Sequence, residues 1–283
     1  MAWMKGVAAA LLLLALVLAL LVALGEARWR RLTRELEAGL ASPAAGPARF
    51  DAQELEGLPA PVQRYLRAAI SEGAPLVRGA TLAHEGQFNL SADGDRWRPF
   101  SSTQRVVTQR PGFVWNGRIA LLPGLSVRVH DAYVGGEGRL HAALLGLFAL
   151  ADLRGRQDEL ARGELMRYLA EAAWYPTALL PSQGVRWQAL DARSARATLS
   201  DGGVSVSLDF HFSAEDGLVE RVRAEARGRS VGTQMQPTPW EGRWSDYQRR
   251  DGLLVPERGV VAWVLPDGER PYWRGRLQAL QYR

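Results

Sequence analysis

Three patterns of apolar and polar positions follow one another along this chain, and the first is an unbroken apolar run. Residues 7–24 read VAAALLLLALVLALLVAL and contain no polar or charged side chain. A helix of this length spans about 27 Å, close to the hydrocarbon thickness of a bilayer. The run predicts a membrane-spanning N-terminal helix, although the small residues Gly25 and Ala27 also fit a cleavable signal peptide.

Helical periodicity continues after this run. Residues 26–40 predict a charged continuation of the helix, so that residues 1–40 form an anchor with a basic juxtamembrane part. The segment 41–49, ASPAAGPAR, predicts a linker. At 59–70, two prolines mark the start of an amphipathic helix with apolar positions three and four residues apart. These positions are Val62, Tyr65, Leu66, Ala69 and Ile70.

From residue 76 onward the apolar positions recur every second residue, which is typical of half-buried strands. A second predicted helix, 158–174, interrupts the strands and is ended by Pro176. Asp-Gly pairs between the later runs predict hairpin turns at 201–202, 216–217, 251–252 and 267–268. The strand-like runs before the second helix are 77–90, 96–109, 112–121, 125–134 and 138–150.

The order of these elements predicts one α+β domain over residues 50–283, because no linker divides this region. Antiparallel sheets with so many strands twist and curl strongly. The two helices each need a surface on which to bury an apolar face. We therefore expect a large curved antiparallel sheet, a half-barrel, with two helices on its concave face and one transmembrane helix before it.

The charge distribution narrows the choice of partners. Residues 1–34 hold five of the 35 basic side chains and one of the 30 acidic ones, so residues 35–283 are close to neutral. A neutral domain argues against nucleic-acid binding, whereas a local basic patch suits the anionic headgroups of a lipid bilayer. The predicted headgroup contacts are Arg28, Arg30, Arg31 and Arg34. The positive-inside rule then predicts a cytoplasmic domain, while the half-barrel architecture favours the extracytoplasmic side.

No catalytic or metal-binding motif is complete. Residues 228–232, GRSVG, match the nucleophile-elbow pattern, but no histidine follows Ser230 and the next residues predict no helix. The four histidines lack zinc-site spacing, and the chain has no cysteine. The motifs therefore assign no catalytic residue, metal or cofactor, and they leave the oligomeric state open.

Strand phase does place polar groups in the expected interior. Alternation puts His84 on the apolar side of 82–90 and Asp131 on the apolar side of 125–133. Such groups need partners, so they predict polar anchors at the base of a pocket or, more plainly, a satisfied core histidine and an aspartate at a bulge. Together with nearby aromatic residues, the candidate ligand-binding set is His84, Trp115, Asp131, Tyr133, Tyr168 and Trp174.

The pattern assigns other charged side chains to solvent-exposed faces of the second helix and of the strands. Glu164, Arg167 and Glu171 share one stripe of the second helix, which predicts surface ion pairs. If that stripe faced the sheet, its carboxylates would be an acid/base candidate. His130 alternates onto the outer face and is expected to be solvated. One face of 218–229 predicts a solvated basic surface, or one that contacts lipid phosphates, formed by Arg221, Arg223, Arg227 and Arg229.

Six longer runs stand out along the chain after residue 57: LPAPVQRYLRAAI (58–70), RPGFVWNGRI (110–119), VRVHDAYVGGEG (127–138), GELMRYLAEAAWYPTALLPSQGVRW (163–187), TPWEGRW (238–244) and LPDGERPYWRG (265–275). These runs resemble a bacterial family known only as a domain of unknown function, and the resemblance covers nearly all of the chain after the predicted linker. The family implies no activity that can be transferred. The order of helices and strands is similar, more loosely, to the half-barrel of periplasmic lipoprotein carriers and lipid-binding lipoproteins.

These observations favour a membrane-anchored binding protein that holds a lipid or other hydrophobic ligand in the curved sheet. Aromatic residues of the last third would form the core, with a subset lining the pocket: Trp240, Trp244, Trp263, Trp273, Tyr247 and Tyr272. The rival hypothesis is an enzyme that acts on a hydrophobic substrate, with His84 and Asp131, or Glu164 and Glu171, as acid and base. A third hypothesis is an assembly partner in the cell envelope.

Overall fold

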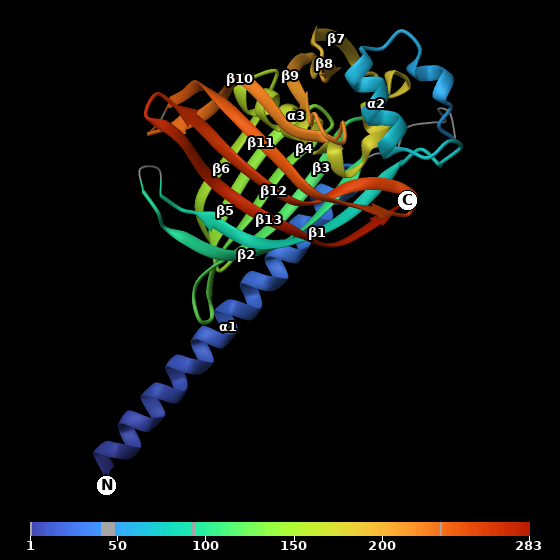
Figure 1. Ribbon diagram of the computed structural model, residues 1–283. Coiled ribbons are helices and arrows are strands. Elements are labelled where there is room, and N and C mark those ends of the chain that lie inside the picture. The colour runs from blue at the N-terminus through green and yellow to red at the C-terminus, as the bar shows by residue number, and fades with distance from the viewer. Residues whose placement is uncertain (1, 41–48, 92–93, 233) are drawn as a thin grey trace.

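The computed structural model describes residues 2–40, 49–91, 94–232 and 234–283. The predicted linker 41–49 lies outside the described residues except for Arg49, which pairs with Pro75 in an isolated bridge. Helix α1, Ala2–Ala38, is long and apolar enough to cross a membrane, and its N-terminal half projects away from the rest of the molecule (Figure 1). Residues 7–24 and the charged continuation therefore form one uninterrupted helix.

The described part of the chain contains thirteen strands in one antiparallel sheet, which confirms the predicted fold class. The spatial order is β6-β5-β4-β3-β2-β1-β13-β12-β11-β10-β9-β8-β7, so that the first strand and the last lie side by side at the centre. The first half consists of β1 Gly79–Asn89, β2 Trp97–Val107, β3 Gly112–Leu122, β4 Leu125–Val134, β5 Glu137–Leu144 and β6 Phe148–Arg156. The second half consists of β7 Arg186–Asp191, β8 Ser194–Asp201, β9 Val204–Phe212, β10 Val219–Val231, β11 Gln234–Arg250, β12 Leu253–Leu265 and β13 Gly268–Tyr282.

Two helices fill the concave face of the curved sheet, as the apolar periodicity predicts (Figure 1). Helix α2, Ala60–Ala69, buries its apolar stripe against β8 and β12. Helix α3, Glu159–Glu171, packs against β3 to β6 and against β9 and β10. Asp158 caps α3 by accepting a hydrogen bond from the backbone N–H of Ala161. The interior beneath these helices is a single large apolar core.

The C-terminal half of α1 lies on the opposite, convex face of the sheet, against β3 and β4. Trp29 is 1% exposed, stacks on His130 at 4.0 Å between ring centroids, and donates its indole N–H to Asn116 Oδ1 at 2.9 Å. The expectation that His130 is solvated is therefore wrong. Strand alternation assigned it to the correct face, but α1 covers that face.

Two local irregularities separate the observed strands from the predicted ones. The predicted strand 138–150 is in fact β5 and the start of β6, because Leu145 and Gly146 both adopt positive φ in a tight turn. A β-bulge between Ala224 and Arg227 also changes the phase of β10. As a result the predicted basic face is wrong beyond this point, and Arg227 points into the half-barrel while Arg223 pairs with Glu241 on the outside.

Candidate functional site

A small cavity of about 120 Å³ remains inside the half-barrel, between α3 and the central strands. Its walls are mainly aromatic, and its polar lining comes from Asp131, Arg167, Glu171 and Arg227. A larger cleft of about 690 Å³ adjoins the cavity and shares Phe88, Asp131, Leu140, Arg227 and Tyr272 with it. The aromatic wall consists of Phe88, Trp115, Trp174, Trp240, Trp244, Tyr272 and Trp273.

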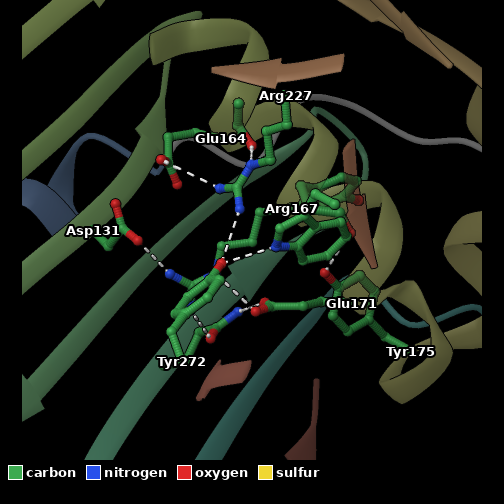
Figure 2. Close-up of polar contacts among 11 residues, drawn as sticks. Asp131, Glu164, Arg167, Glu171, Tyr175, Arg227 and Tyr272 are labelled. Atoms are coloured by element: carbon green, nitrogen blue, oxygen red, sulfur yellow. Dashed lines mark hydrogen bonds and ion pairs between the residues drawn. The ribbon is translucent and has the colours of Figure 1, made fainter. Parts of the chain in front are cut away.

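Arg167 of α3 is the centre of the polar lining (Figure 2). Its Nη1 donates to Asp131 Oδ2 at 2.5 Å, and its Nε donates to Glu171 Oε1 at 2.7 Å. The guanidinium also lies 5.0 Å from the ring centroid of Phe113 and 5.2 Å from that of Trp115. Burial lowers the pKa of Arg167, but the neighbouring carboxylates outweigh this effect and raise it above its ordinary value. Arg167 is therefore a permanent buried cation.

Arg227 of β10 enters the same region from the other side (Figure 2). Its Nε donates to the carbonyl of Gly163 at 3.2 Å, and its Nη1 donates to the Tyr272 hydroxyl at 3.2 Å. Its guanidinium lies 5.1 Å from the ring centroid of Trp240. The nearest carboxylate is Glu164, whose Oε1 is 3.9 Å from Nη2 and so beyond hydrogen-bond distance. Arg227 thus lacks the close carboxylate partners that Arg167 has.

Glu164 of α3 is buried, and its Oε2 has no hydrogen-bond partner. Burial and the negative charge of Asp131 raise its pKa well above the ordinary value, with Arg227 opposing the shift. Asp131 and Glu171 both bind Arg167, so Arg227 is the arginine of the cavity without a hydrogen-bonded carboxylate.

The structure brings together only part of the predicted ligand-binding set. Trp115, Asp131 and Trp174 line the cavity. Tyr133 instead bonds to Asp201, and Tyr168 lies in the core against Tyr175.

His84 lies behind the aromatic wall, with its ring centroid 4.5 Å from that of Trp174, and neither ring nitrogen has a partner. Burial, reinforced by the charge of Arg167, lowers its pKa to about 3. The structure does not pair His84 with Asp131, because Asp131 binds Arg167 instead.

The assignment of Glu164, Arg167 and Glu171 to a wet face is wrong. Helix α3 is enclosed by the half-barrel, so this stripe faces the sheet and the cavity. The charges are tolerated because Arg167 pairs with Asp131 on β4 and with Glu171 on its own helix, while Arg227 on β10 lies 3.9 Å from Glu164. The sequence placed Arg227 on an outer basic face and gave no sign of its inward position, because that position depends on the bulge in β10.

The motif residues that were set aside lie away from this cavity. Ser230 of the GRSVG segment is on β10 and donates to Met235 Sδ at 3.2 Å, within a hairpin and not at a strand-to-helix turn. Among the described residues, no group of three histidine or carboxylate side chains is placed to hold a metal ion. The chemistry available in the cavity and the adjoining cleft is therefore an aromatic surface combined with buried arginines and carboxyl groups.

A family comparison matches most of the chain, over residues 56–282, to the family of unknown function DUF6920. The chain belongs to DUF6920. No curated protein matches it. Among solved structures, this DUF6920 protein is similar to a LolA superfamily protein from Nitrosomonas europaea, at 10% identity and a TM-score of 0.42 over 79% of this chain and 92% of that one. It is also similar to a β-barrel-like protein of the domain of unknown function DUF1849 from Brucella abortus, at 10% identity and a TM-score of 0.26 over 74% and 98% of the two chains.

Proposed function

We propose that this DUF6920 protein is a membrane-anchored binding protein for a lipid or another amphipathic molecule with an acidic head. The observation that carries the proposal is the aromatic cavity, which holds two buried arginines and adjoins an open cleft in an otherwise filled half-barrel. Binding sites for small molecules commonly combine apolar walls with a few polar anchors.

The size of the space determines how a ligand would lie. A cavity of about 120 Å³ is smaller than the usual range for ligand pockets, whereas the cleft of about 690 Å³ falls within it. We therefore place most of the ligand in the cleft, with its acidic head against Arg227. Because the nearest carboxylate to Arg227, that of Glu164, lies 3.9 Å away, an anion can bind Arg227 without breaking a hydrogen bond to a carboxylate.

The packing of α1 supports retention of the helix as an anchor. Gly25 is buried where α1 contacts the turn between β5 and β6, and Glu26 pairs with Arg128 of β4. The small-residue segment 25–27 would have to leave these contacts to be cleaved as a signal peptide. We therefore propose that α1 spans the membrane and that the half-barrel stays attached to it.

Ligand uptake by the full-length protein in detergent micelles tests this proposal. A pyrene-labelled fatty acid should bind with about one-to-one stoichiometry, detected as energy transfer from the cavity tryptophans. Its methyl ester should bind more weakly, because the ester lacks the anionic head. Arg227→Met should weaken binding of the acid about tenfold, a loss of about 1.4 kcal/mol.

The control is Arg221→Met, on the same strand but on the outer face, which should bind as the wild type does. Absence of saturable uptake by the wild-type protein would refute the binding function. Equal affinities for acid and ester would refute the role of Arg227.

An enzyme is the second candidate, favoured by the buried carboxyl of Glu164 at the edge of the cleft, whose Oε2 has no hydrogen-bond partner. A protonated carboxyl there is placed to donate a proton to a bound ester or amide. Glu164→Gln separates the two functions, because a binder keeps its ligand after this change. If the protein is an enzyme, the Glu164→Gln variant should still bind the substrate but should no longer convert it.

A further inference from the structure

Helix α1 and the turn between β5 and β6 are in contact where the apolar run of α1 ends. A Cβ atom at Gly25 would lie too close to the carbonyl oxygen of Leu145, so glycine is what permits this approach. One turn later, Arg28 Nη1 donates to the carbonyl of Leu147 at 3.1 Å. The β5–β6 turn therefore lies at the level of residue 25, which marks the membrane boundary if residues 7–24 span the bilayer.

The turn between β3 and β4 extends further along α1 (Figure 1). A groove between them is lined by Ala19 and Val22 on the helix and by Gly124 and Ser126 on the hairpin. Ala19 precedes Gly25 by six residues, or about 9 Å along the helix axis. The tip of this hairpin therefore lies beside a part of α1 that belongs inside the hydrocarbon layer.

Both hairpins carry large apolar side chains that the rest of the protein leaves exposed. Leu122, in the β3–β4 tip, is 65% exposed, and Phe148 and Leu150, after the β5–β6 turn, are 56% and 61% exposed. The strand registers put all three at one end of the sheet. Val127 of β4 pairs with Ile119 of β3 on one side and with Leu144 of β5 on the other, and Leu144 pairs in turn with Phe148 of β6. We call Leu122, Phe148 and Leu150 the apolar lip. Apolar side chains gathered at one place on a surface mark a site of contact with a partner or a membrane.

Arginines lie at the depth expected for lipid phosphates. Arg30 on α1 and Arg118 on β3 border the groove that separates the β3–β4 tip from the helix. Arg30 lies more than one helical turn beyond Gly25, on the side away from the apolar run. Basic side chains above an apolar surface are the usual arrangement at a membrane interface.

We propose that the apolar lip enters the bilayer beside α1, so that the half-barrel rests on the membrane with its cleft at the surface. This inference rests on the proposed anchor, and it adds a route for the ligand. The cleft is lined by Phe88 and Leu90 from the β1–β2 hairpin, at the same end of the sheet as the lip. A lipid can then pass between the bilayer and the cleft without crossing water.

Site-specific fluorescence tests the inference, because the chain has no cysteine and an introduced one is the only labelling site. Leu122→Cys and Phe148→Cys are each labelled with the environment-sensitive dye NBD. The control is Glu215→Cys, exposed in the β9–β10 turn at the other end of the sheet. The full-length proteins are reconstituted into vesicles of phosphatidylcholine and phosphatidylglycerol, with and without lipids that carry a nitroxide on the acyl chain.

Labels at 122 and 148 should emit at shorter wavelength and lose at least half of their intensity to the nitroxide lipid. The label at 215 should do neither. If the labels at 122 and 148 show neither the shift nor the quenching while the protein floats with the vesicles, the lip is not in the bilayer and the anchor still stands. If the protein does not float with the vesicles, the anchor and the inference both fail.

A second experiment tests the route for the ligand. The double variant Leu122→Glu, Phe148→Glu should take up a pyrene-labelled phosphatidylglycerol from vesicles at least tenfold more slowly than the wild type. Its affinity for the pyrene-labelled fatty acid in detergent should be unchanged, because the lip does not line the cavity. Unchanged uptake from vesicles would overturn the route, whereas a matching loss in detergent would show damage to the fold or to the cleft.

Discussion

Replacement of Arg167 by methionine tests the buried ion network most directly. Methionine keeps an apolar chain against Phe113 and Trp115 but leaves the carboxylates of Asp131 and Glu171 without their cation. Removal of one partner from a buried ion pair costs about 3–5 kcal/mol, because the remaining charge stays desolvated. Gln104 still donates to Glu171 Oε2 at 2.6 Å, so we expect a loss near the middle of that range, about 4 kcal/mol, at neutral pH.

The assay is urea unfolding of the full-length protein in detergent, followed by tryptophan fluorescence. The loss of stability in the Arg167→Met variant should depend on pH, which distinguishes an effect of charge from an effect of packing. Without Arg167 the buried negative charges of Asp131 and Glu171 lack a partner, and acid conditions that remove negative charge relieve this cost. The penalty is then greatest at neutral pH and shrinks as the pH falls toward about 4.

A triple variant, Arg167→Met with Asp131→Asn and Glu171→Gln, removes the unpaired charges and should recover most of the lost stability. A loss below about 1 kcal/mol in the single variant would refute the reasoning, since it would mean that water reaches the network. Failure of the triple variant to recover would assign the loss to packing and not to charge.

Two further predictions concern the packing of α1 and the buried histidines. Trp29→Ala should cost about 3–5 kcal/mol of packing between α1 and the sheet, seen as faster hydrogen exchange of residues 26–38, while Trp3→Ala, at an exposed position, should leave that exchange unchanged. Burial lowers the pKa of both His84 and His130 to about 3, so the stability that their neutral forms contribute is complete above pH 6.5 and is lost as the pH falls. Near pH 5 each of the two histidines should lower the free energy of unfolding by about 2 kcal/mol relative to neutral pH. His130→Gln should therefore reduce the fall in the urea midpoint between about pH 7 and 5. An unchanged fall would contradict the burial of His130.

The sequence predicted the inward residues well wherever the strands are regular. Alternation with a period of two is a geometric property of a strand, so Trp115 and Asp131 could be assigned to the interior without knowledge of their neighbours. The same rule fails for Arg227, because the bulge after Ala224 shifts the phase. Where the bulge forms depends on the pairing with β11, the next strand along the chain, and not on the alternation within β10 itself.

Burial of charge was harder to predict than burial of apolar side chains, for a related reason. The stripe Glu164, Arg167 and Glu171 has the spacing of a surface ion-pair ladder, and nothing local distinguishes it from one. Its environment is set by Asp131 and Arg227, which lie on strands before and after the helix. The same holds for His130. Alternation assigned it to the correct face of the sheet, but its burial depends on α1, which lies a hundred residues earlier in the sequence.

The docking of α1 fixes the position of its apolar run relative to the cleft. Trp29, Glu26 and Arg28 all contact the sheet or its turns, so α1 itself is fixed to the half-barrel. A domain on a long tether samples many orientations, and its cleft faces the bilayer only part of the time. Here the contacts of α1 with β3, β4 and the β5–β6 turn hold the lip beside the apolar run in a single geometry. The proposed ligand route therefore depends on the α1 contacts, because these contacts place the lip beside the apolar run.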